Sequence, residues 1–356
     1  MATHFLHVVG ARPNFMKLAP VYAALGARGV RQTVVHTGQH YDAEMSDVFF
    51  RDLDLPPPDL NLEVGSGSHA KQTARIMLRL EPVLLELKPD AVLVYGDVNS
   101  TVSAALVAAK LLIPIGHVEA GLRSFDRTMP EELNRVVTDA LADWLFTPSV
   151  DANENLAREG IPESKIHFVG NVMIDTLVRF LPRAEAPKEW RKLDRYALVT
   201  LHRPSNVDDL KMLARIMKAL KELASHLPVI FPVHPRTLRR LAELGLGREA
   251  RDGLHLSSPL SYLEFLGLQR GAAIVVTDSG GIQEETTFLG VPCLTLRKNT
   301  ERPVTVTEGT NKLLGEEPER IVPEARAVLE GRWKQGRVPE LWDGKAAERI
   351  ASVIAS

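Results

Sequence analysis

The sequence predicts an α/β protein built from two doubly wound parallel sheets. Short apolar, β-branched runs alternate with stretches of helical periodicity along the chain, which is the pattern of a parallel sheet covered by helices. The alternation occurs on both sides of Gly170-Asn171, and 356 residues exceed the usual size of one domain. We therefore expect a Rossmann-like domain over residues 1–170, joined by the C-terminal helix 343–356, and a second over residues 171–342, with a hinge at Gly170-Asn171.

In the first domain, a strand over residues 5–9 leads through a turn into a helix over 15–28, and a second strand ends at Val35. A polar, proline-rich connection follows over 52–69. The remaining expected elements are a helix over 70–87, a strand over 91–95, a helix over 100–112, a strand over 113–118, a helix opening at Pro130, and strands over 144–147 and 166–169.

The second domain repeats this pattern. The expected strands are 196–200, 229–233, 254–256, 273–277 and 292–296, and the expected helices are 208–225, a helix from 237, 261–269 and 281–289. The stretch 181–195 is rich in proline and charge, and we expect it to be a solvated connector.

Composition limits the kind of partner. The chain has 43 Lys and Arg against 45 Asp and Glu, so there is no bulk attraction to nucleic acid or to an anionic membrane surface. The single cysteine, Cys293, excludes an intrachain disulfide and is expected in the core. No apolar run approaches the roughly 20 residues of a membrane span, and no basic leader precedes the first strand. We expect a cytoplasmic protein with a small-molecule partner.

Three acids of the first domain fall at strand ends or helix starts. Asp97 and Glu119 follow neighbouring parallel strands, where open α/β sheets bind ligands, and Glu131 lies beside Pro130 at the start of a helix. Carboxylates at one sheet edge suit acid/base chemistry. The alternative for each acid is a helix cap or a salt bridge to a nearby arginine.

Arg12 and Lys17 follow the first strand, in a segment that lacks the GxGxxG pattern of dinucleotide binding. We therefore do not expect NAD. Cations at the carboxyl edge of a sheet can neutralise phosphate, although both residues also fit as ordinary surface cations.

The segment TDSGGIQEE, residues 277–285, follows a buried strand and opens a helix. Ser279, Gly280 and Gly281 let backbone N–H groups approach an anion at the positive helix end, as a nucleotide diphosphate requires. Glu285 is placed to accept hydrogen bonds from ribose hydroxyls. The alternative is an ordinary turn in which Ser279 caps the helix.

His202 directly follows a strand, and its titration near neutral pH suits proton transfer or a bond to phosphate. A structural histidine is the alternative, and His234 has the same two interpretations. The chain has no HExxH motif, no cysteine cluster and no tight Asp pair, so we expect neither a metal nor another cofactor.

Taken in order, these motifs resemble those of the non-hydrolysing UDP-N-acetylglucosamine 2-epimerase family. The resemblance covers nearly the whole chain and rests on GARPNFMKLAP, HTGQHYD, YGDVNSTVSAALVAAK, HVEAGLRS, PEELNR, TLHRPSN, TDSGGIQEE and LRKNTERPVTVTEGTN.

The resemblance implies a GT-B fold, two Rossmann-like domains facing a central cleft, and a homodimer. It implies reversible epimerisation of UDP-N-acetylglucosamine to UDP-N-acetylmannosamine through elimination of UDP, 2-acetamidoglucal, and re-addition of UDP. Matched by motif, Asp97, Glu119 and Glu131 are the acid/base residues, and His202 assists at the cleaving phosphate bond. The implied UDP-binding residues are Arg12, Lys17, Phe265, Ser279, Gly280, Gly281, Glu285 and Arg302.

Two segments depart from the family pattern. Many members read QHREM where this chain reads QHYDAEM at 39–45, and Asn-Pro follows the histidine that matches His234, where this chain has Pro235-Arg236. Both regions relate to an allosteric UDP-N-acetylglucosamine site in some members, so allostery stays open here. The alternative functions are a 2-epimerase for a modified UDP-sugar such as a diacetamido uronate, a GT-B glycosyltransferase, and a non-enzymatic nucleotide-sugar sensor.

Overall fold

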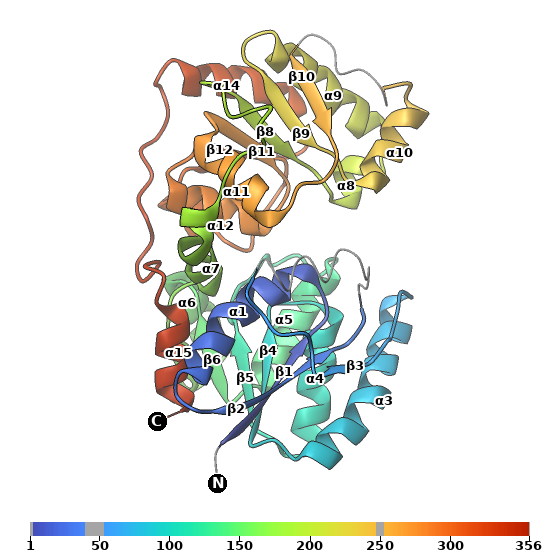
Figure 1. Cartoon of the computed structure of the whole chain (residues 1–356), viewed down its shortest axis with the longest axis vertical. Helices are drawn as coiled ribbons and strands as arrows, with labels where there is room; N and C mark the ends of the chain where they lie inside the picture. The colour runs from blue at the N-terminus through green and yellow to red at the C-terminus, as the bar shows by residue number, and fades with distance from the viewer. Residues whose placement is uncertain (1–2, 40–52, 247–252, 356) are drawn as a thin grey trace. The chain divides into compact units, whose positions relative to one another are not determined.

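The computed structural model describes residues 3–39, 53–246 and 253–355, and the chain divides into two compact units. The N-terminal unit comprises Met1–Arg179 and Glu340–Ser356, and the C-terminal unit comprises Phe180–Pro339 (Figure 1). The predicted boundary lay at residue 170. The helix that follows it stays with the N-terminal unit, because Thr176 donates a hydrogen bond to the backbone carbonyl of Met16 at 2.5 Å.

Seven parallel strands form the sheet of the N-terminal unit, in the order β3-β2-β1-β4-β5-β6-β7. The order reverses between β1 and β4, where Val8 pairs with Val94. Ligands of open α/β sheets bind beyond the carboxyl ends of the strands at such a reversal. The strands are β1 (His4–Val9), β2 (Arg31–His36), β3 (Leu60–Asn61), β4 (Ala91–Tyr95), β5 (Ile115–Val118), β6 (Trp144–Thr147) and β7 (Ile166–Phe168). The helices are α1 (Arg12–Gly26), α3 (His69–Leu87), α4 (Asn99–Lys110), α5 (Pro130–Leu141), α6 (Val150–Arg158), the 3-10 turn Glu163–Lys165, α7 (Val172–Phe180) and α15 (Ala346–Ile354).

Six parallel strands form the sheet of the C-terminal unit, in the order β10-β9-β8-β11-β12-β13. Here the order reverses between β8 and β11, where Thr200 pairs with Thr277. The strands are β8 (Ala197–Thr200), β9 (Val229–Pro232), β10 (Leu254–Ser257), β11 (Ile274–Thr277), β12 (Cys293–Thr295) and β13 (Asn311–Leu313). The helices are α8 (Pro204–Val207), α9 (Leu210–Ala224), α10 (Pro235–Glu243), α11 (Tyr262–Gly271), α12 (Gly280–Leu289), α13 (Val304–Thr307), α14 (Ile321–Leu329) and the 3-10 turns Leu181–Arg183 and Pro318–Arg320. The predicted doubly wound parallel sheets are thereby confirmed.

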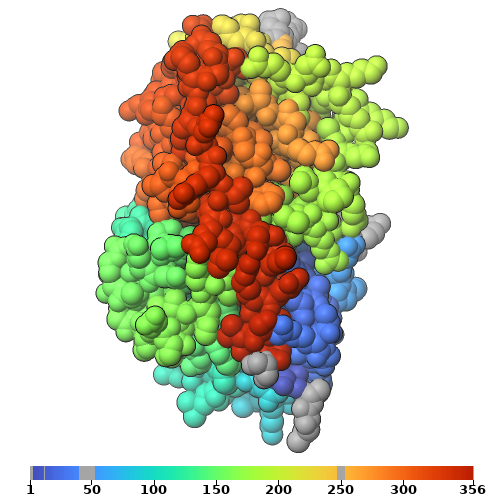
Figure 2. All heavy atoms as spheres, turned by 90° about the vertical axis from the view of Figure 1, so that its left-hand side faces the viewer, coloured from blue at the N-terminus to red at the C-terminus, as the bar shows by residue number. Residues whose placement is uncertain are grey.

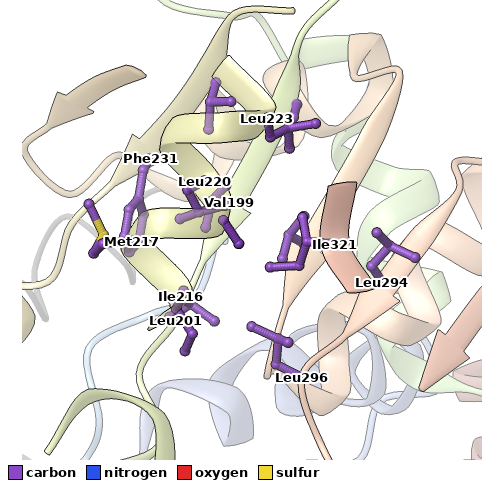
Figure 3. Packing of buried hydrophobic residues seen from close by; sticks show 14 of the residues in the cluster. Val199, Leu201, Ile216, Met217, Leu220, Leu223, Phe231, Leu294, Leu296 and Ile321 are labelled. Atoms are coloured by element: carbon purple, nitrogen blue, oxygen red, sulfur yellow. The ribbon is translucent and has the colours of Figure 1, made fainter. Parts of the chain in front are cut away.

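Helix α9 shows how the sequence builds the core of the C-terminal unit. The Asp209 carboxylate accepts two hydrogen bonds from N–H groups of the first turn, which starts the helix at Leu210. Ile216, Leu220 and Leu223 then recur at helical spacing and pack with Phe231 of β9 in one fully buried cluster (Figure 3). Truncating any of these leucines to alanine should cost about 2–5 kcal/mol of stability. This core holds the carboxyl ends of β8 and β9 in place.

The C-terminal segment belongs to the N-terminal unit. The Trp342 indole N–H donates to the backbone carbonyl of Pro148 at 2.8 Å. The buried Asp175 carboxylate accepts hydrogen bonds from Ala346 N and Ala347 N at 3.1 and 2.7 Å, which caps α15 from another helix. Figure 2 shows the red C-terminal segment beside the blue α1. A carboxylate distant in sequence therefore sets where the last helix begins.

The stretch 181–195 was predicted to be a solvated connector, and this prediction is wrong in part. Ala184 is buried, and the chain passes so close to α11 that a Cβ on Gly267 would lie 2.4 Å from Ala186 N. The absence of a side chain at Gly267 permits this approach. Cys293 is buried in β12, as predicted. Within the described ranges, no helix has the length and hydropathy needed to cross a membrane.

Candidate active site

Asp97 and Glu119 follow two neighbouring strands of the N-terminal unit. β4 and β5 pair in parallel up to Tyr95 and Val118, so the turns that contain Asp97 and Glu119 begin at the same edge of the sheet. Gly96 has φ +63° and Glu119 has φ +74°, a backbone conformation that is costly for a residue with a side chain. The strained turn at Glu119 is therefore maintained by the structure around it.

Lys17 pairs with Glu119. The Lys17 Nζ lies 2.6 Å from Glu119 Oε2, and both side chains are nearly inaccessible to solvent. A Cβ on Gly96 would lie 2.6 Å from the same Nζ, so glycine leaves the space that the ammonium occupies. The prediction that Lys17 contacts phosphate stays a prediction, and the structure adds a carboxylate partner that the sequence did not indicate.

Asp97 pairs with Arg135, one of the arginines that the sequence offered as an alternative partner. Arg135 Nη1 lies 2.6 Å from Asp97 Oδ2, and its Nη2 lies 2.7 Å from Glu132 Oε2. Burial alone would raise the pKa of Glu132, but the N–H of Ser124 and the Arg135 guanidinium lower it. The side chain of Asp97 stays 24% exposed. It can therefore take part in a salt bridge and still meet a ligand.

Glu131 is the second residue of α5, directly before Glu132, and is half-buried. Arg12 is the first residue of α1, and its side chain lies outside what the structure describes. The turn before it is held by Asn14, whose Oδ1 accepts from Gly10 N and Ala11 N at 3.1 and 3.0 Å. The backbone at Arg12 thus starts a helix at the same sheet edge as the acids.

His202 follows β8 and is oriented by Asp278, which follows β11. The His202 Nδ1 lies 3.0 Å from Asp278 Oδ1, and the Asp278 carboxylate also accepts from the backbone N–H groups of His202 and Arg203. Burial would raise the pKa of Asp278, but its bonds to His202 and Asn206 lower it. The His202 side chain is 56% exposed, so its ring can meet a ligand while one nitrogen stays bonded.

The segment Ser279-Gly280-Gly281 forms the start of α12. Ser279 is the N-cap residue, and its N–H donates to Thr277 Oγ1 at 3.0 Å. A Cβ on Gly280 would lie 2.5 Å from Arg302 Nη1, so the guanidinium packs against the glycine backbone at the positive helix end. Gly281 is the second residue of the helix and is half-buried.

Arg302 is held by two carboxylates. Its Nε lies 2.8 Å from Glu284 Oε1, and its Nη1 contacts Glu301, which also pairs with Arg297 at 2.6 Å. All four side chains are buried. The guanidinium is therefore fixed beside the start of α12 before any ligand arrives, which would reduce the entropy that binding must remove.

Glu285 lies deeper in the C-terminal unit. It is buried, and the Tyr262 hydroxyl donates to its Oε1 at 3.2 Å. Burial is the main cause that raises the pKa of Glu285 to about 7, with the neighbouring Glu284 adding to it. Phe265, one turn along α11 from Tyr262, is half-buried and packs against the core. Its part in binding UDP, which the resemblance implies, remains a prediction.

The structure therefore collects the predicted residues into two sets. The N-terminal unit brings together Asp97, Glu119 and Lys17, and places Arg12 and Glu131 at the starts of helices. The C-terminal unit brings together His202, the start of α12, and Arg302. The first set suits proton transfer, and the second suits binding of a diphosphate.

Sequence reasoning missed the residues that orient the predicted ones, chiefly Asp278 for His202 and Glu301 for Arg302. One signal was available for Asp278. Asp278 directly follows a strand, and it stands in the same motif as Ser279. No local pattern in the sequence indicated which acid would face which cation.

Comparison with known proteins covers almost the whole chain. A sequence profile described as UDP-N-acetylglucosamine 2-epimerase matches residues 23–355. The UDP-N-acetylglucosamine 2-epimerase of Methanocaldococcus jannaschii is 43% identical over 360 residues, covering 98% of this chain and 97% of that protein. The UDP-2,3-diacetamido-2,3-dideoxy-D-glucuronate 2-epimerase of Pseudomonas aeruginosa is 43% identical over 354 residues, covering 98% and 99%.

A crystal structure of the Methanocaldococcus jannaschii protein, in complex with UDP-GlcNAc and UDP, matches with a TM-score of 0.90 and 42% identity, covering 99% of each chain. The GT-B-like fold is thereby confirmed.

Proposed function

The chain belongs to the UDP-N-acetylglucosamine 2-epimerase family, and we propose that this enzyme reversibly converts UDP-N-acetylglucosamine to UDP-N-acetylmannosamine. The observation that carries the proposal is the pair of acids on neighbouring strand ends, with Lys17 bonded to Glu119. Binding of UDP-GlcNAc and UDP by a relative that is 42% identical supports the choice of substrate.

The chemistry explains why several acids and a diphosphate site are needed. The hydrogen on carbon 2 has no adjacent carbonyl to stabilise a carbanion, so removal of this proton must be coupled to loss of a leaving group. A carboxylate takes the proton, the electron pair forms the carbon 1–carbon 2 double bond, and the bond from carbon 1 to the diphosphate oxygen breaks. UDP then adds back to the 2-acetamidoglucal while an acid returns a proton to the opposite face.

The roles follow from the two sets of residues. Asp97, Glu119 and Glu131 supply the acid and the base, and His202 supports the diphosphate as charge develops on it. The proposed UDP-binding residues are Arg12, Lys17, Phe265, Ser279, Gly280, Gly281, Glu285 and Arg302. The reaction changes no oxidation state, so these residues suffice without a redox cofactor.

A second substrate has a specific observation in its favour. The diacetamido glucuronate 2-epimerase is as similar to this chain, at 43% identity, as the UDP-N-acetylglucosamine 2-epimerase reported above. Such a substrate adds a carboxylate at carbon 6 and an acetamido group at carbon 3, and the same elimination would apply to it.

A proton NMR time course in D₂O tests the proposal. Each UDP-sugar is supplied separately, and the diacetamido uronate is also supplied with a trace of UDP-N-acetylglucosamine to satisfy any allosteric requirement. The manno epimer of UDP-N-acetylglucosamine with deuterium at carbon 2 is the expected product. Turnover of the diacetamido uronate without turnover of UDP-N-acetylglucosamine would overturn the substrate assignment. Turnover of neither UDP-sugar would overturn the proposal. Asp97→Asn and Glu119→Gln should each lower turnover by about 100-fold.

We also propose that the enzyme is a homodimer. Large apolar side chains are exposed on two helices of the N-terminal unit, with Leu78 of α3 at 72% and Leu85, Leu133 and Val137 also exposed. Exposed apolar side chains mark an interaction site where they form one contiguous patch. Light scattering at micromolar concentration should give twice the chain mass of 39.3 kDa, and a monomer would overturn this proposal.

A further inference from the structure

A buried group of charged side chains lies beneath the strand ends that carry Asp97 and Glu119. His117 is the third residue of β5 and Asp139 lies on α5, and both are fully buried. The His117 Nδ1 lies 2.6 Å from Asp139 Oδ1, and the other Asp139 oxygen lies 2.7 Å from Arg123 Nη1. Arg123 in turn pairs with Glu159 at 2.6 Å. The first three of these side chains are buried, and Glu159 is partly exposed.

Both nitrogens of the His117 ring face oxygen atoms that can only accept. The Nε2 lies 2.8 Å from the backbone carbonyl oxygen of Gly96, and the Nδ1 faces the Asp139 carboxylate. Burial alone would raise the pKa of Asp139, but the charges and hydrogen bonds of His117 and Arg123 lower it, so this carboxyl is ionised. The ring therefore lies between the Asp139 carboxylate and the Gly96 carbonyl and connects the two.

The His117–Asp139 pair forms hydrogen bonds with both turns that carry the proposed acids. Through His117 it holds the carbonyl of Gly96, the residue directly before Asp97. Through its second oxygen, Asp139 accepts from Gly121 N at 3.1 Å, two residues after Glu119. Glu119 is a non-glycine residue with positive φ, so its turn needs outside contacts to keep its conformation.

We propose that Asp139 and His117 are positioning residues, which fix the Asp97 and Glu119 turns relative to each other through one shared buried carboxylate. The inference rests on the proposed epimerase function. Its physical basis is that a misplacement of about 1 Å at a catalytic group can cost about 100-fold in rate, and that hydrogen-bonded supporting residues prevent it.

Substitutions at His117 separate the two connections. An asparagine at this position carries an amide N–H₂ near the site of Nδ1, so it can keep the bond to Asp139 while losing Gly96. A glutamine carries its N–H₂ near the site of Nε2, so it can keep Gly96 while losing Asp139. Asp139→Asn places an amide N–H₂ where a carboxylate oxygen accepted, and therefore loses at least one connection. We expect turnover to fall about tenfold or more in all three variants.

Leu84→Ala is the matched control for stability. Leu84 lies on α3 in the core of the same unit and is buried. All variants are assayed below the temperature at which Leu84→Ala begins to unfold. The positioning role predicts that kcat falls in the His117 and Asp139 variants while affinity for UDP, measured by titration calorimetry, stays within about threefold. Leu84→Ala should keep the kcat of the native protein.

Two results would overturn the proposal. One is native kcat in Asp139→Asn and both His117 variants. The other is an affinity for UDP that falls in these variants as far as kcat does, which is the result of a general structural defect. These outcomes differ from failure of the proposed function, in which the native protein itself converts neither UDP-sugar.

Discussion

Replacing Asp175 by asparagine tests how the C-terminal helix is held on the N-terminal unit. The Asp175 carboxylate is buried and accepts the N–H groups of Ala346 and Ala347 at the start of α15. Burial raises the pKa of Asp175 from 3.8 to about 6, although the two N–H donors act in the opposite direction. In the unfolded chain the carboxyl titrates near 3.8, so the folded protein binds this proton more tightly.

The sign of the pH effect follows from this difference. A raised pKa in the folded state gives stability that is fully present below 3.8 and is lost as pH rises through about 6. Between pH 7.5 and pH 5, the two pKa values correspond to a gain of about 1.4 kcal/mol for the native protein, or about tenfold in an equilibrium constant. Asparagine does not titrate, so the variant lacks this gain.

Hydrogen exchange of the α15 amides measures the effect locally, under conditions where exchange reports the opening equilibrium. The ratio of exchange rates, variant over native, should rise about tenfold from pH 7.5 to pH 5. Asp343→Asn is the control, because Arg349 lowers the pKa of Asp343 and its contribution is lost as pH falls. A ratio for Asp175→Asn that is constant or falls on acidification would refute the reasoning. It would show that the helix N-terminus, and not burial, controls this carboxyl.

Three further predictions concern the C-terminal unit. Gly280→Ala should displace the Arg302 guanidinium, because the new Cβ would lie 2.5 Å from Nη1. Affinity for UDP, measured by calorimetry, should fall about tenfold, and an unchanged affinity would contradict this. Asp278→Asn removes the carboxylate that orients His202 and should lower turnover about tenfold or more. Native turnover in this variant would show that the His202 ring does not need the carboxylate. Glu285 has a pKa raised to about 7, so its ionised fraction should rise about tenfold from pH 6 to pH 8. If ribose binds the ionised form, UDP affinity should rise over this range more steeply in the native protein than in Glu285→Gln, and identical pH profiles would contradict it.

Much of the fold was predictable because its signals are local. The run AVLVY at 91–95 is apolar without alternation, as in a strand buried on both faces, and the alanine-rich stretch after it has helical spacing. The structure has β4 at Ala91–Tyr95 and α4 at Asn99–Lys110. Elements with weaker signals were not predicted, such as the short helix α8 and the strand β13 at Asn311–Leu313. Residues 40–45, where the chain departs from the family pattern, lie outside the described residues.

The positions of the candidate site residues were also predictable, because a residue that follows a parallel strand must lie at the carboxyl edge of its sheet. Asp97, Glu119 and His202 all satisfy this rule. Their partners were not predictable. Lys17 and Glu119 are about a hundred residues apart, and several arginines near Asp97 were equally plausible partners from the sequence.

Local patterns in the sequence were enough to predict most strands and helices in order, the parallel sheets, and the sheet edge at which each motif lies. These properties depend on hydrophobic periodicity and turn chemistry, which act over a few neighbouring residues. Only the tertiary structure decided that Arg135 pairs with Asp97, that Asp139 joins two turns through His117, and that Asp175 caps a helix at the end of the chain. Ion pairs and hydrogen bonds act over about 3–4 Å, and packing sets which distant side chains come within that distance.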